Sequence, residues 1–441
     1  MSIATVPRGL QTLLSPLTGT VAALDERLLE PGDALLHASW CELPQPADGS
    51  PGSGLVQAGG GWSAVAASAR AAALGEAVER RCAGTVDETR LVRATAAELG
   101  REALDPGRIR LFQPSQVEGT ALVLPDRSTS LRWLRGVRLP DRQPAWLPAQ
   151  LVHLAPLPAE ADDSVDEPLL TLPTSNGLAC GPSFERAALS ALLELVERDA
   201  FTLTWAGRLS LPRLEWQGNA ELEEFAATRL APTGLRYAAI DLSPFLGVPV
   251  VLGVVSPPAG RPGPTAVGAA ASATAAEATR RALAEAFAAF AAARAFVRTR
   301  GDRSFADDGS DLDAFDDRVL FYADPKRAGA LAFLTACAER RHVGEVPRLA
   351  GSTPAGQLAE LCARIAARGG TAYAADLTTV DVADAGLHVV RALCPELCPL
   401  DASQALRFLG VPRLLTGAHE AGLTSRPLLL EEVNSDPHPF P

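Results

Sequence analysis

Three long alanine-rich segments constrain the fold of this chain more than any other feature of its sequence. They run over about 63–82, 183–206 and 274–297, and each has the apolar spacing of a helix that buries one face. Short apolar runs separate them, and two of these, 236–242 and 248–255, have the composition of adjacent buried strands. Long helices that alternate with apolar strands predict an α/β (α+β) fold.

Smaller elements are predicted between and after these helices. A Gly/Pro/Ser loop is expected over 43–62, and the acidic, proline-rich segment 154–170 marks a boundary between lobes. We expect strands at 121–125, 145–152, 371–377 and 387–394, and helices at 355–368 and near 402–408. The lobes would be N-terminal (1–160), central (161–325) and C-terminal (326–441).

Composition excludes several classes of protein. The 441-residue chain has a formal charge of −12, which argues against nucleic-acid binding, because that needs a clustered positive surface. No apolar run reaches the ~18 residues of a membrane span and no signal-peptide pattern opens the chain, so we expect a cytoplasmic protein without membrane contact. Lys326 is the only lysine, a bias typical of GC-rich bacteria, and this excludes a P-loop, which needs Gly-Lys-Ser/Thr. The seven cysteines form no CxxC pair and are expected to be reduced and mostly buried.

The strongest internal signal is a near-repeat in the first two helices. ALGEAVER (73–80) and ALLELVER (191–198) agree at six of eight positions. Because residues three apart share a helix face, each copy presents two carboxylates side by side. Their apolar neighbours indicate partial burial, which is costly for like charges unless a cation neutralises them. The repeat therefore predicts a site for a hard divalent ion such as Mg²⁺, which usually also binds substrate phosphates.

Each pattern also has a simpler explanation. A single ExxER motif is more often a solvated helix face with local Glu–Arg pairing, although the duplication weakens that explanation. Arg281 and Glu285, four residues apart in the third helix, would by themselves be a surface ion pair. The run GGGWSA (59–64) fits the dinucleotide pattern GxGxxA, but no clear strand precedes it. The alternating prolines of PHPFP (437–441) favour an extended tail, and the alternative is a disordered end.

Several motifs in order resemble the YcaO family over nearly the whole chain. SNGLACG (175–181) before the second helix resembles the central signature of that family, and ALGEAVERRCAG (73–84) resembles its first carboxylate helix. The later blocks follow in order, with Asp241-Leu242 and its neighbouring strand, RALAEAF (281–287) and residues 376–397. SPLTGTV (15–21) and the PHPFP terminus resemble the subgroup that acts in ribosomal peptide maturation.

The resemblance implies one YcaO domain over 1–441, with mixed sheets and long alanine-rich helices around a nucleotide and metal site. It also implies an ATP- and Mg²⁺-dependent cyclodehydratase component. In that chemistry a Cys, Ser or Thr side chain of a precursor peptide attacks the preceding carbonyl, ATP phosphorylates the amide oxygen, and loss of phosphate leaves a thiazoline or oxazoline. The reaction needs cations on the phosphates and a base for the protons that move.

The same resemblance assigns roles to residues of this chain. The residues that would hold Mg²⁺ are Glu76, Glu79, Glu194 and Glu197. Those that would contact nucleotide or organise the metal ligands are Asn176, Arg198, Arg281 and Glu285. The Pro441 carboxylate would enter the site and assist proton transfer or substrate alignment.

Three positions depart from the family pattern. Gly60 stands where a basic residue is usual, Ala72 where a serine is usual, and Arg186 where an acidic residue is usual. At ~100° per residue, Arg186 lies about 20° from Glu197 around the helix, so it could contact phosphate in place of one metal ion. The alternative is a non-catalytic scaffold that binds a peptide or a catalytic partner without using ATP. Thioamide or amidine formation, the other amide chemistry of the family, is a further alternative, and the proline-rich terminus favours azolines.

The resemblance also predicts partners. The block before the first carboxylate helix is short, and 441 residues barely exceed the catalytic core of the family. We therefore expect a separate protein, E1-like or a peptide-recognition domain, that captures the leader of the precursor peptide. A homodimer is a further expectation from the family. Without the family, the residues alone indicate a metal-dependent nucleotide enzyme of undefined substrate.

Overall fold

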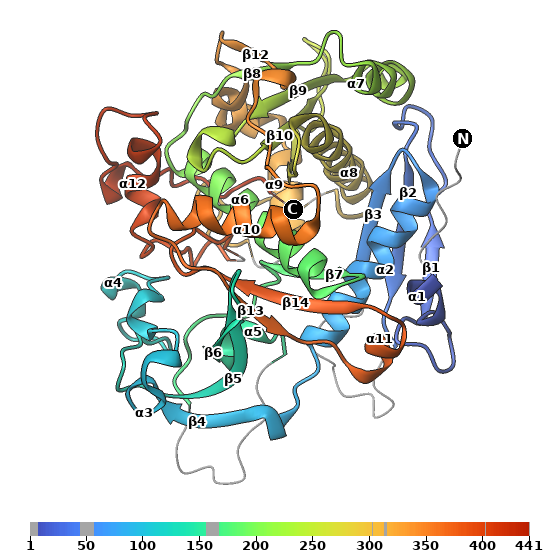
Figure 1. Cartoon of the computed structure of the whole chain (residues 1–441). Coiled ribbons are helices and arrows are strands. Elements are labelled where there is room, and N and C mark those ends of the chain that lie inside the picture. Colours follow the sequence, from blue (N-terminus) through green and yellow to red (C-terminus); the bar gives the residue numbers. More distant parts are fainter. Residues whose placement is uncertain are drawn as a thin grey trace.

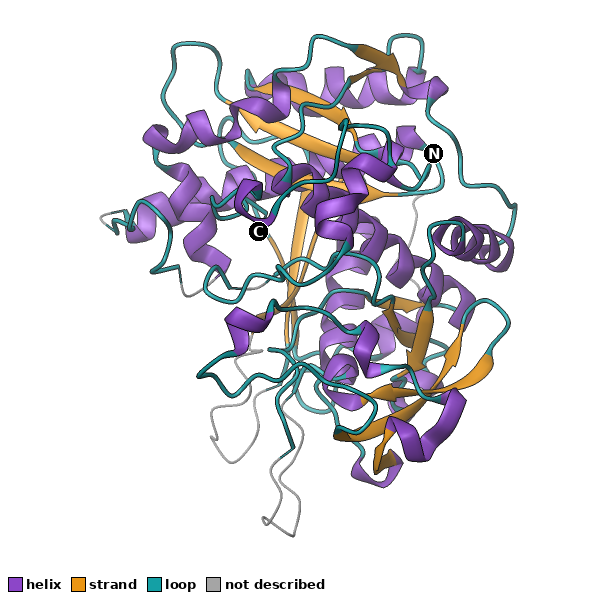
Figure 2. Ribbon diagram, turned by 90° about the vertical axis from the view of Figure 1, so that its left-hand side faces the viewer, coloured by secondary structure: helices purple, strands orange, loops and turns teal. Residues whose placement is uncertain are grey.

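Three sheets and the long helices between them make up the fold (Figure 1). The computed structural model describes residues 8–44, 57–155, 167–301, 303–312, 315–401 and 403–440. Helices and strands are interspersed from one end of the molecule to the other (Figure 2). The mixed α+β class expected from the sequence is confirmed.

A three-stranded antiparallel sheet packs against the first long helix, α2 (Ala66–Ala83). Its strands are β1 (Ala23–Glu26), β2 (His37–Glu42) and β3 (Gln57–Ser63). Gly59 and Gly61 permit this contact, because a Cβ at either position would clash with a main-chain carbonyl of α2. The loop expected over 43–62 is therefore wrong for 57–62, where glycines serve close packing rather than a turn. Residues 45–56 of that expectation lie outside the described residues.

A five-stranded sheet packs against the third long helix, α8 (Ala275–Arg300). Its order is β11-β10-β9-β8-β12, from β11 (Ala266–Ala271), β10 (Val250–Ser256), β9 (Arg236–Asp241), β8 (Arg213–Glu215) and β12 (Arg340–His342). Val251 pairs with Asp241 on one side and Ala270 on the other, both in antiparallel register. The two adjacent buried strands predicted near 236–242 and 248–255 are confirmed as β9 and β10.

The six-stranded sheet lies against the second long helix, α6 (Phe184–Ala206) (Figure 1). It has the order β4-β5-β13-β14-β7, with β6 beside β5; the strands are β4 (Leu91–Thr95), β5 (Ser130–Arg138), β6 (Gln143–Pro148), β7 (Leu178–Gly181), β13 (Tyr373–Asp376) and β14 (His388–Leu393). The strands expected at 371–377 and 387–394 are confirmed. The strand expected at 145–152 ends at Pro148, where helix α5 (Ala149–Val152) begins. The strand expected at 121–125 is wrong, because Leu122 makes one isolated bridge to Leu169 and Pro125 follows.

Side-chain caps explain where the long helices begin. Ser183 accepts a hydrogen bond from the Arg186 N–H at the start of α6, and Thr274 caps α8 in the same way. The helices expected at 63–82, 183–206, 274–297 and 355–368 are confirmed, the last as α10 (Pro354–Ala366). The shorter helices are α1 (Arg8–Thr12), α3 (Ala96–Leu99), α4 (Pro114–Val117), α7 (Ala220–Phe225), α9 (Phe315–Ala323), α11 (Val380–Asp384) and α12 (Arg413–Glu420).

The helix expected near 402–408 is wrong for the described residues 403–408. They form turns, because Gln404 and Arg407 donate side-chain hydrogen bonds to the main-chain carbonyls of Ser435 and Asn434. The next helix is α12, which begins only after Pro412. The chain at 403–408 thus follows contacts with the C-terminal tail rather than its own helical pattern.

Burial and thiol state agree with the sequence. All seven cysteines are free, and five of them are buried. Among the described helices, none combines the length and the apolar character needed to cross a membrane.

Candidate functional site

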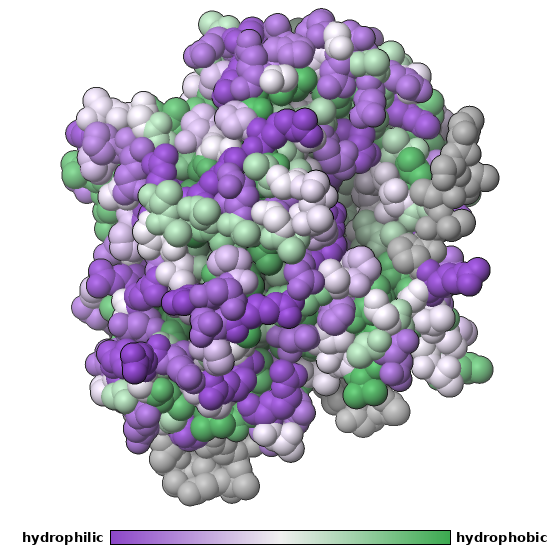
Figure 3. Space-filling view, in the orientation of Figure 1, coloured by the Kyte–Doolittle hydropathy of each residue, from purple (hydrophilic) through white to green (hydrophobic). Residues whose placement is uncertain are grey.

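A cleft of about 930 Å³ opens where α2, α6 and α8 meet. The surface is hollowed between the part that carries α10 and the part that carries β3, with hydrophilic side chains on one wall (Figure 3). Eight of the residues singled out from the sequence line the cleft: Glu76, Glu79, Arg186, Glu194, Glu197, Arg198, Arg281 and Glu285. Both copies of the ExxER near-repeat therefore face one space.

Each of the four repeat glutamates has one carboxylate oxygen fixed by a main-chain N–H. The donors are Gly60 to Glu76 (2.7 Å), Cys180 to Glu79 (2.7 Å), Gly177 to Glu194 (3.2 Å) and Ala271 to Glu197 (3.0 Å). These donors lie in β3, in β7, in the turn before β7 and at the end of β11. All three sheets thus orient carboxylates toward the cleft, and the second oxygen of each remains for a cation.

Arginine side chains lie next to the second carboxylate oxygen of three of these glutamates. Arg80 Nη2 lies 2.5 Å from Glu76 Oε1, and Arg198 Nη2 lies 3.5 Å from Glu194 Oε1. Arg198 Nη1 is 3.7 Å from Glu197 Oε1, and this buried atom makes no hydrogen bond to any described residue. A buried guanidinium nitrogen without an acceptor matches a site built for an additional anionic oxygen.

Burial and mutual repulsion raise the pKa of three cleft carboxylates, Glu79, Glu194 and Glu285. Burial is the main cause for Glu194, whose pKa rises to about 7, and for Glu285, whose pKa rises to about 8 with a contribution from Glu197. Burial and then the charge of Glu76 raise the pKa of Glu79 well above its ordinary value. The cleft is therefore short of positive charge, and a divalent cation would displace protons from it.

Arg281 and Glu285 are not a simple surface ion pair. Both line the cleft, and no ion pair joins them in the described part of the chain. Arg281 Nη1 instead donates to the carbonyl of Ala271 (3.2 Å), the residue whose N–H fixes Glu197. Arg281 and the candidate metal ligand Glu197 are therefore both held by the main chain of Ala271.

Asn176 lies beside the cleft rather than on its wall. Its side-chain amide donates to Thr174 Oγ1 and to the carbonyl of Leu400, both at 2.9 Å. It lines a separate cavity of about 90 Å³. Direct contact of Asn176 with a nucleotide stays a prediction.

The three positions that depart from the family pattern have different surroundings. Gly60 supplies the N–H that fixes Glu76, and Ala72 is exposed on α2. Arg186 is exposed on the cleft wall, and its guanidinium has no hydrogen-bond or ion-pair partner among the described residues. Arg186 thus adds a cation to the cleft that no described residue neutralises.

The C-terminal tail reaches the same place. Pro441 lies outside the described residues, so the predicted role of its carboxylate is untested. Phe440 is buried, and the guanidinium carbon of Arg198 lies 4.2 Å from the centre of its ring. A disordered end is therefore wrong for the described tail residues.

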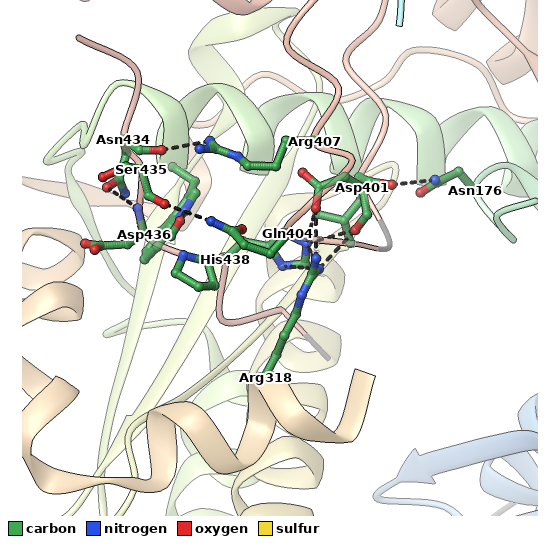
Figure 4. A network of polar contacts seen from close by, with 12 residues as sticks. Asn176, Arg318, Asp401, Gln404, Arg407, Asn434, Ser435, Asp436 and His438 are labelled. Carbon is green, nitrogen blue, oxygen red and sulfur yellow. Dashed lines mark hydrogen bonds and ion pairs between the residues drawn. The ribbon is translucent and has the colours of Figure 1, made fainter. Parts of the chain in front are cut away.

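Sequence reasoning missed the groups that hold this tail. Arg318 of α9 and Asp401 form a buried ion pair at 2.9 Å, and His438 contacts both (Figure 4). Arg318 and Asp401 are 83 positions apart and belong to no local motif. The only signal was the histidine within PHPFP.

The cleft fits Mg²⁺ together with a phosphate ligand better than a bare metal centre. Across the described ranges, no group of three or more His, Cys, Asp or Glu side chains is arranged to hold a metal by itself. Mg²⁺ commonly uses one or two carboxylates and completes its shell with waters and substrate phosphates. Paired glutamates, arginines on the wall and a large volume match that arrangement.

Comparison of sequences connects the chain to a known family. The family model for YcaO cyclodehydratase, described as ATP- and Mg²⁺-binding, matches residues 60–398. An uncharacterised protein in the tfuA 3′ region of Rhizobium leguminosarum bv. trifolii is 27% identical over 177 residues, which are 38% of this chain and 40% of that protein.

Solved structures share the fold. A heterocyclase in complex with substrate and cofactor matches 99% of this chain and 57% of its own, with a TM-score of 0.78 and 23% identity. YcaO from Methanopyrus kandleri, bound with AMPPCP and Mg²⁺, matches 88% of this chain and 89% of its own, with a TM-score of 0.60 and 20% identity. A chain of the E. coli microcin synthetase McbBCD complex with pro-MccB17 bound matches 97% of this chain and 98% of its own, with a TM-score of 0.58 and 14% identity. The chain covers less than two thirds of the Rhizobium protein and of the first heterocyclase.

Proposed function

The chain belongs to the YcaO family, and from this premise we propose that it is the ATP-dependent cyclodehydratase component of an azoline-forming system. Its substrate would be a ribosomal precursor peptide whose Cys, Ser or Thr side chains become thiazolines or oxazolines. The observation that carries the proposal is the cleft in which four glutamates, each anchored by a main-chain N–H, lie beside arginines.

The proposed roles follow from the charges of the cleft. Bound Mg²⁺ neutralises phosphate charge, and the carboxylates that would hold it are Glu76, Glu79, Glu194 and Glu197. Arg198 and Arg281 would donate hydrogen bonds to phosphate oxygens, while Glu285 would help to orient them. Arg186, which has no partner in the described part of the chain, would add a further cation on the cleft wall where the family usually has an acidic residue.

The proton transfers need a base next to the peptide. The Pro441 carboxylate is the proposed group, and its support is the burial of Phe440 against Arg198 directly before it. It would accept the proton of the attacking side chain or align the peptide, while burial behind the tail would limit the access of water.

Partners follow from the chemistry of the substrate. A similar heterocyclase is described in complex with substrate, and McbBCD is a complex with pro-MccB17 bound. For this chain we propose a precursor peptide and a separate leader-binding protein, and a homodimer remains a prediction. Cytoplasmic location likewise remains a prediction.

Calorimetry with ATP and Mg²⁺ tests the nucleotide site. We expect wild type and Glu277→Gln to bind, and Glu197→Gln to lose binding, because Glu277 lies on α8 but does not line the cleft. With precursor and leader-binding protein added, mass spectrometry should show the loss of one water per ring. No binding even with the partner present would favour the scaffold alternative. Exchange of oxygen for sulfur in the product would instead indicate a thioamide.

A further inference from the structure

Phe440, the last described residue of the tail, lies against the guanidinium of Arg198, which contacts two cleft carboxylates. Phe440 is 1% exposed, and its ring lies 4.9 Å from that of Phe201 between centroids. The guanidinium carbon of Arg198 is 4.2 Å from the centre of the Phe440 ring, well within the ~6 Å range of a cation–π interaction. The same guanidinium contacts Glu194 and Glu197. The position of Phe440 therefore restrains the Arg198 guanidinium, one of the positive charges of the cleft.

Hydrogen bonds fix the segment that precedes Phe440. Trp205 Nε1 donates to the carbonyl of Asp436 (3.0 Å), and the Tyr322 hydroxyl donates to the carbonyl of Pro437. Prolines on both sides of His438 restrict its backbone. The tail is thus held from α6 and from α9.

An ion pair lies at the centre of these contacts (Figure 4). Arg318 is 2% exposed and donates to Asp401 through Nη2 to Oδ1 (2.9 Å) and through Nη1 to the carbonyl (3.0 Å). His438 Nε2 donates to the same carbonyl (3.0 Å), and its ring contacts Arg318. Burial and then the charge of Arg318 lower the pKa of His438, so the imidazole is a neutral donor at neutral pH. Removal of either charge would leave the other buried without its partner.

One turn connects this ion pair to the cleft. The Asn176 amide holds the carbonyl of Leu400, directly before Asp401, while the N–H of Gly177 fixes Glu194. The loop that carries Asp401 and the carboxylate that contacts Arg198 are therefore held by adjacent residues.

We propose that Arg318, Asp401 and His438 are positioning residues, which hold the tail so that Phe440 keeps Arg198 between Glu194 and Glu197. Asn176 has a positioning role in the same network, through Leu400. The inference rests on the proposed function and deepens its account of the same cleft.

A fluorine label tests the placement of the tail without any activity. With 4-fluorophenylalanine at position 440, the ¹⁹F resonance of wild type should have the shift of a buried ring, and Asp401→Asn should move it to that of a free tail. Asp33→Asn is the matched control, because Asp33 is 4% exposed, pairs with Arg27 and Arg294, and lies outside this network. An unchanged resonance in folded Asp401→Asn would overturn the inference.

A double-mutant cycle tests whether the ion pair acts through the tail. Asp401→Asn and Phe440→Ala should each lower kcat/KM about tenfold or more, and the double variant should be no worse than Phe440→Ala alone. If the losses in kcat/KM multiply in the double variant, the proposal is contradicted. A higher kcat/KM in Arg318→Lys than in Arg318→Ala would support it. If Asp401→Asn does not fold, His438→Asn replaces it in a cycle with Phe440→Leu. Absence of ATP turnover in wild type would contradict the proposed function, and the fluorine result would still decide the inference.

Discussion

At the scale of single residues, the cleft holds more carboxylate than its arginines neutralise. The pKa of Glu194 is raised to about 7 and that of Glu285 to about 8, both mainly by burial, from an ordinary value of 4.5. Between pH 4.5, where these carboxylates titrate in the unfolded chain, and pH 7 to 8, where they titrate in the folded chain, the folded chain binds more protons than the unfolded chain. The stability that these protons provide is complete below pH 4.5 and is lost as pH rises through 7 to 8.

We therefore expect the free energy of unfolding, measured with urea in EDTA, to fall from pH 5 to pH 8 by a few kcal/mol, at about 1.4 kcal/mol per unit of pKa. Glu285→Gln should reduce this slope, because it removes one of the titrating groups. Glu277→Gln should keep it, since that carboxylate lies outside the cleft. The same slope in wild type and Glu285→Gln would show that Glu285 does not titrate as stated.

Arg186 makes a second prediction at this scale. Because its guanidinium is exposed on the cleft wall without a partner in the described chain, it can approach phosphate with little rearrangement. Arg186→Ala should weaken Mg²⁺·ATP binding by about tenfold, the effect of one charge-assisted hydrogen bond. Arg280→Ala is the control, since Arg280 pairs with Glu277 away from the cleft wall. Equal affinities for wild type and Arg186→Ala would exclude this role.

At the scale of elements, glycines set how closely strands approach helices. A Cβ at Gly61 would clash with the carbonyl of Ala69 in α2, whereas a Cβ at Gly60 would have no other heavy atom within 4 Å. Gly61→Ala should therefore lower the free energy of unfolding by about 1–3 kcal/mol, the cost of overpacking. Gly60→Ala should stay near wild type, and equal losses in both variants would assign the effect to strand propensity. Urea denaturation distinguishes the two outcomes.

The same glycines and alanines explain what the sequence could predict. The long helices were predictable because their apolar spacing and their caps, such as Ser183 and Thr274, are local. Strand β11 (AVGAAA) was not, because alanine and glycine have low strand propensity and serve here to admit α8, which lies against Gly268.

The residues of the site also divide into those that the sequence could predict and those that it could not. The glutamates were predictable because residues three apart share a helix face. Asp401 and Arg318 were not, because their pairing spans 83 positions and depends on the tertiary fold. The helix predicted near 402–408 is wrong for 403–408 because the hydrogen-bond partners of Gln404 and Arg407 lie in the tail, 31 and 27 positions further along the chain.

At the scale of the whole molecule, the cleft lies where separate hydrophobic clusters meet. The core face of α2 belongs to one cluster with Leu74 and Val78, that of α6 to another with Leu192 and Val196, and that of α8 to a third with Phe287. The carboxylates of each helix reach the shared space from its own cluster. A ligand that binds all of them contacts helices whose core faces belong to three different hydrophobic clusters.

This arrangement predicts that Mg²⁺·ATP stabilises the three helices together. At a ligand concentration of 100 times Kd, the gain is about 2.7 kcal/mol, or about a hundredfold slowing of amide exchange through global opening. Hydrogen exchange should slow in α2, α6 and α8 alike. In the double variant Glu76→Gln/Glu79→Gln, which removes two of the proposed Mg²⁺ ligands, this protection should fall in all three helices together. Protection confined to one helix in wild type would mean that the ligand binds a single cluster and does not join them.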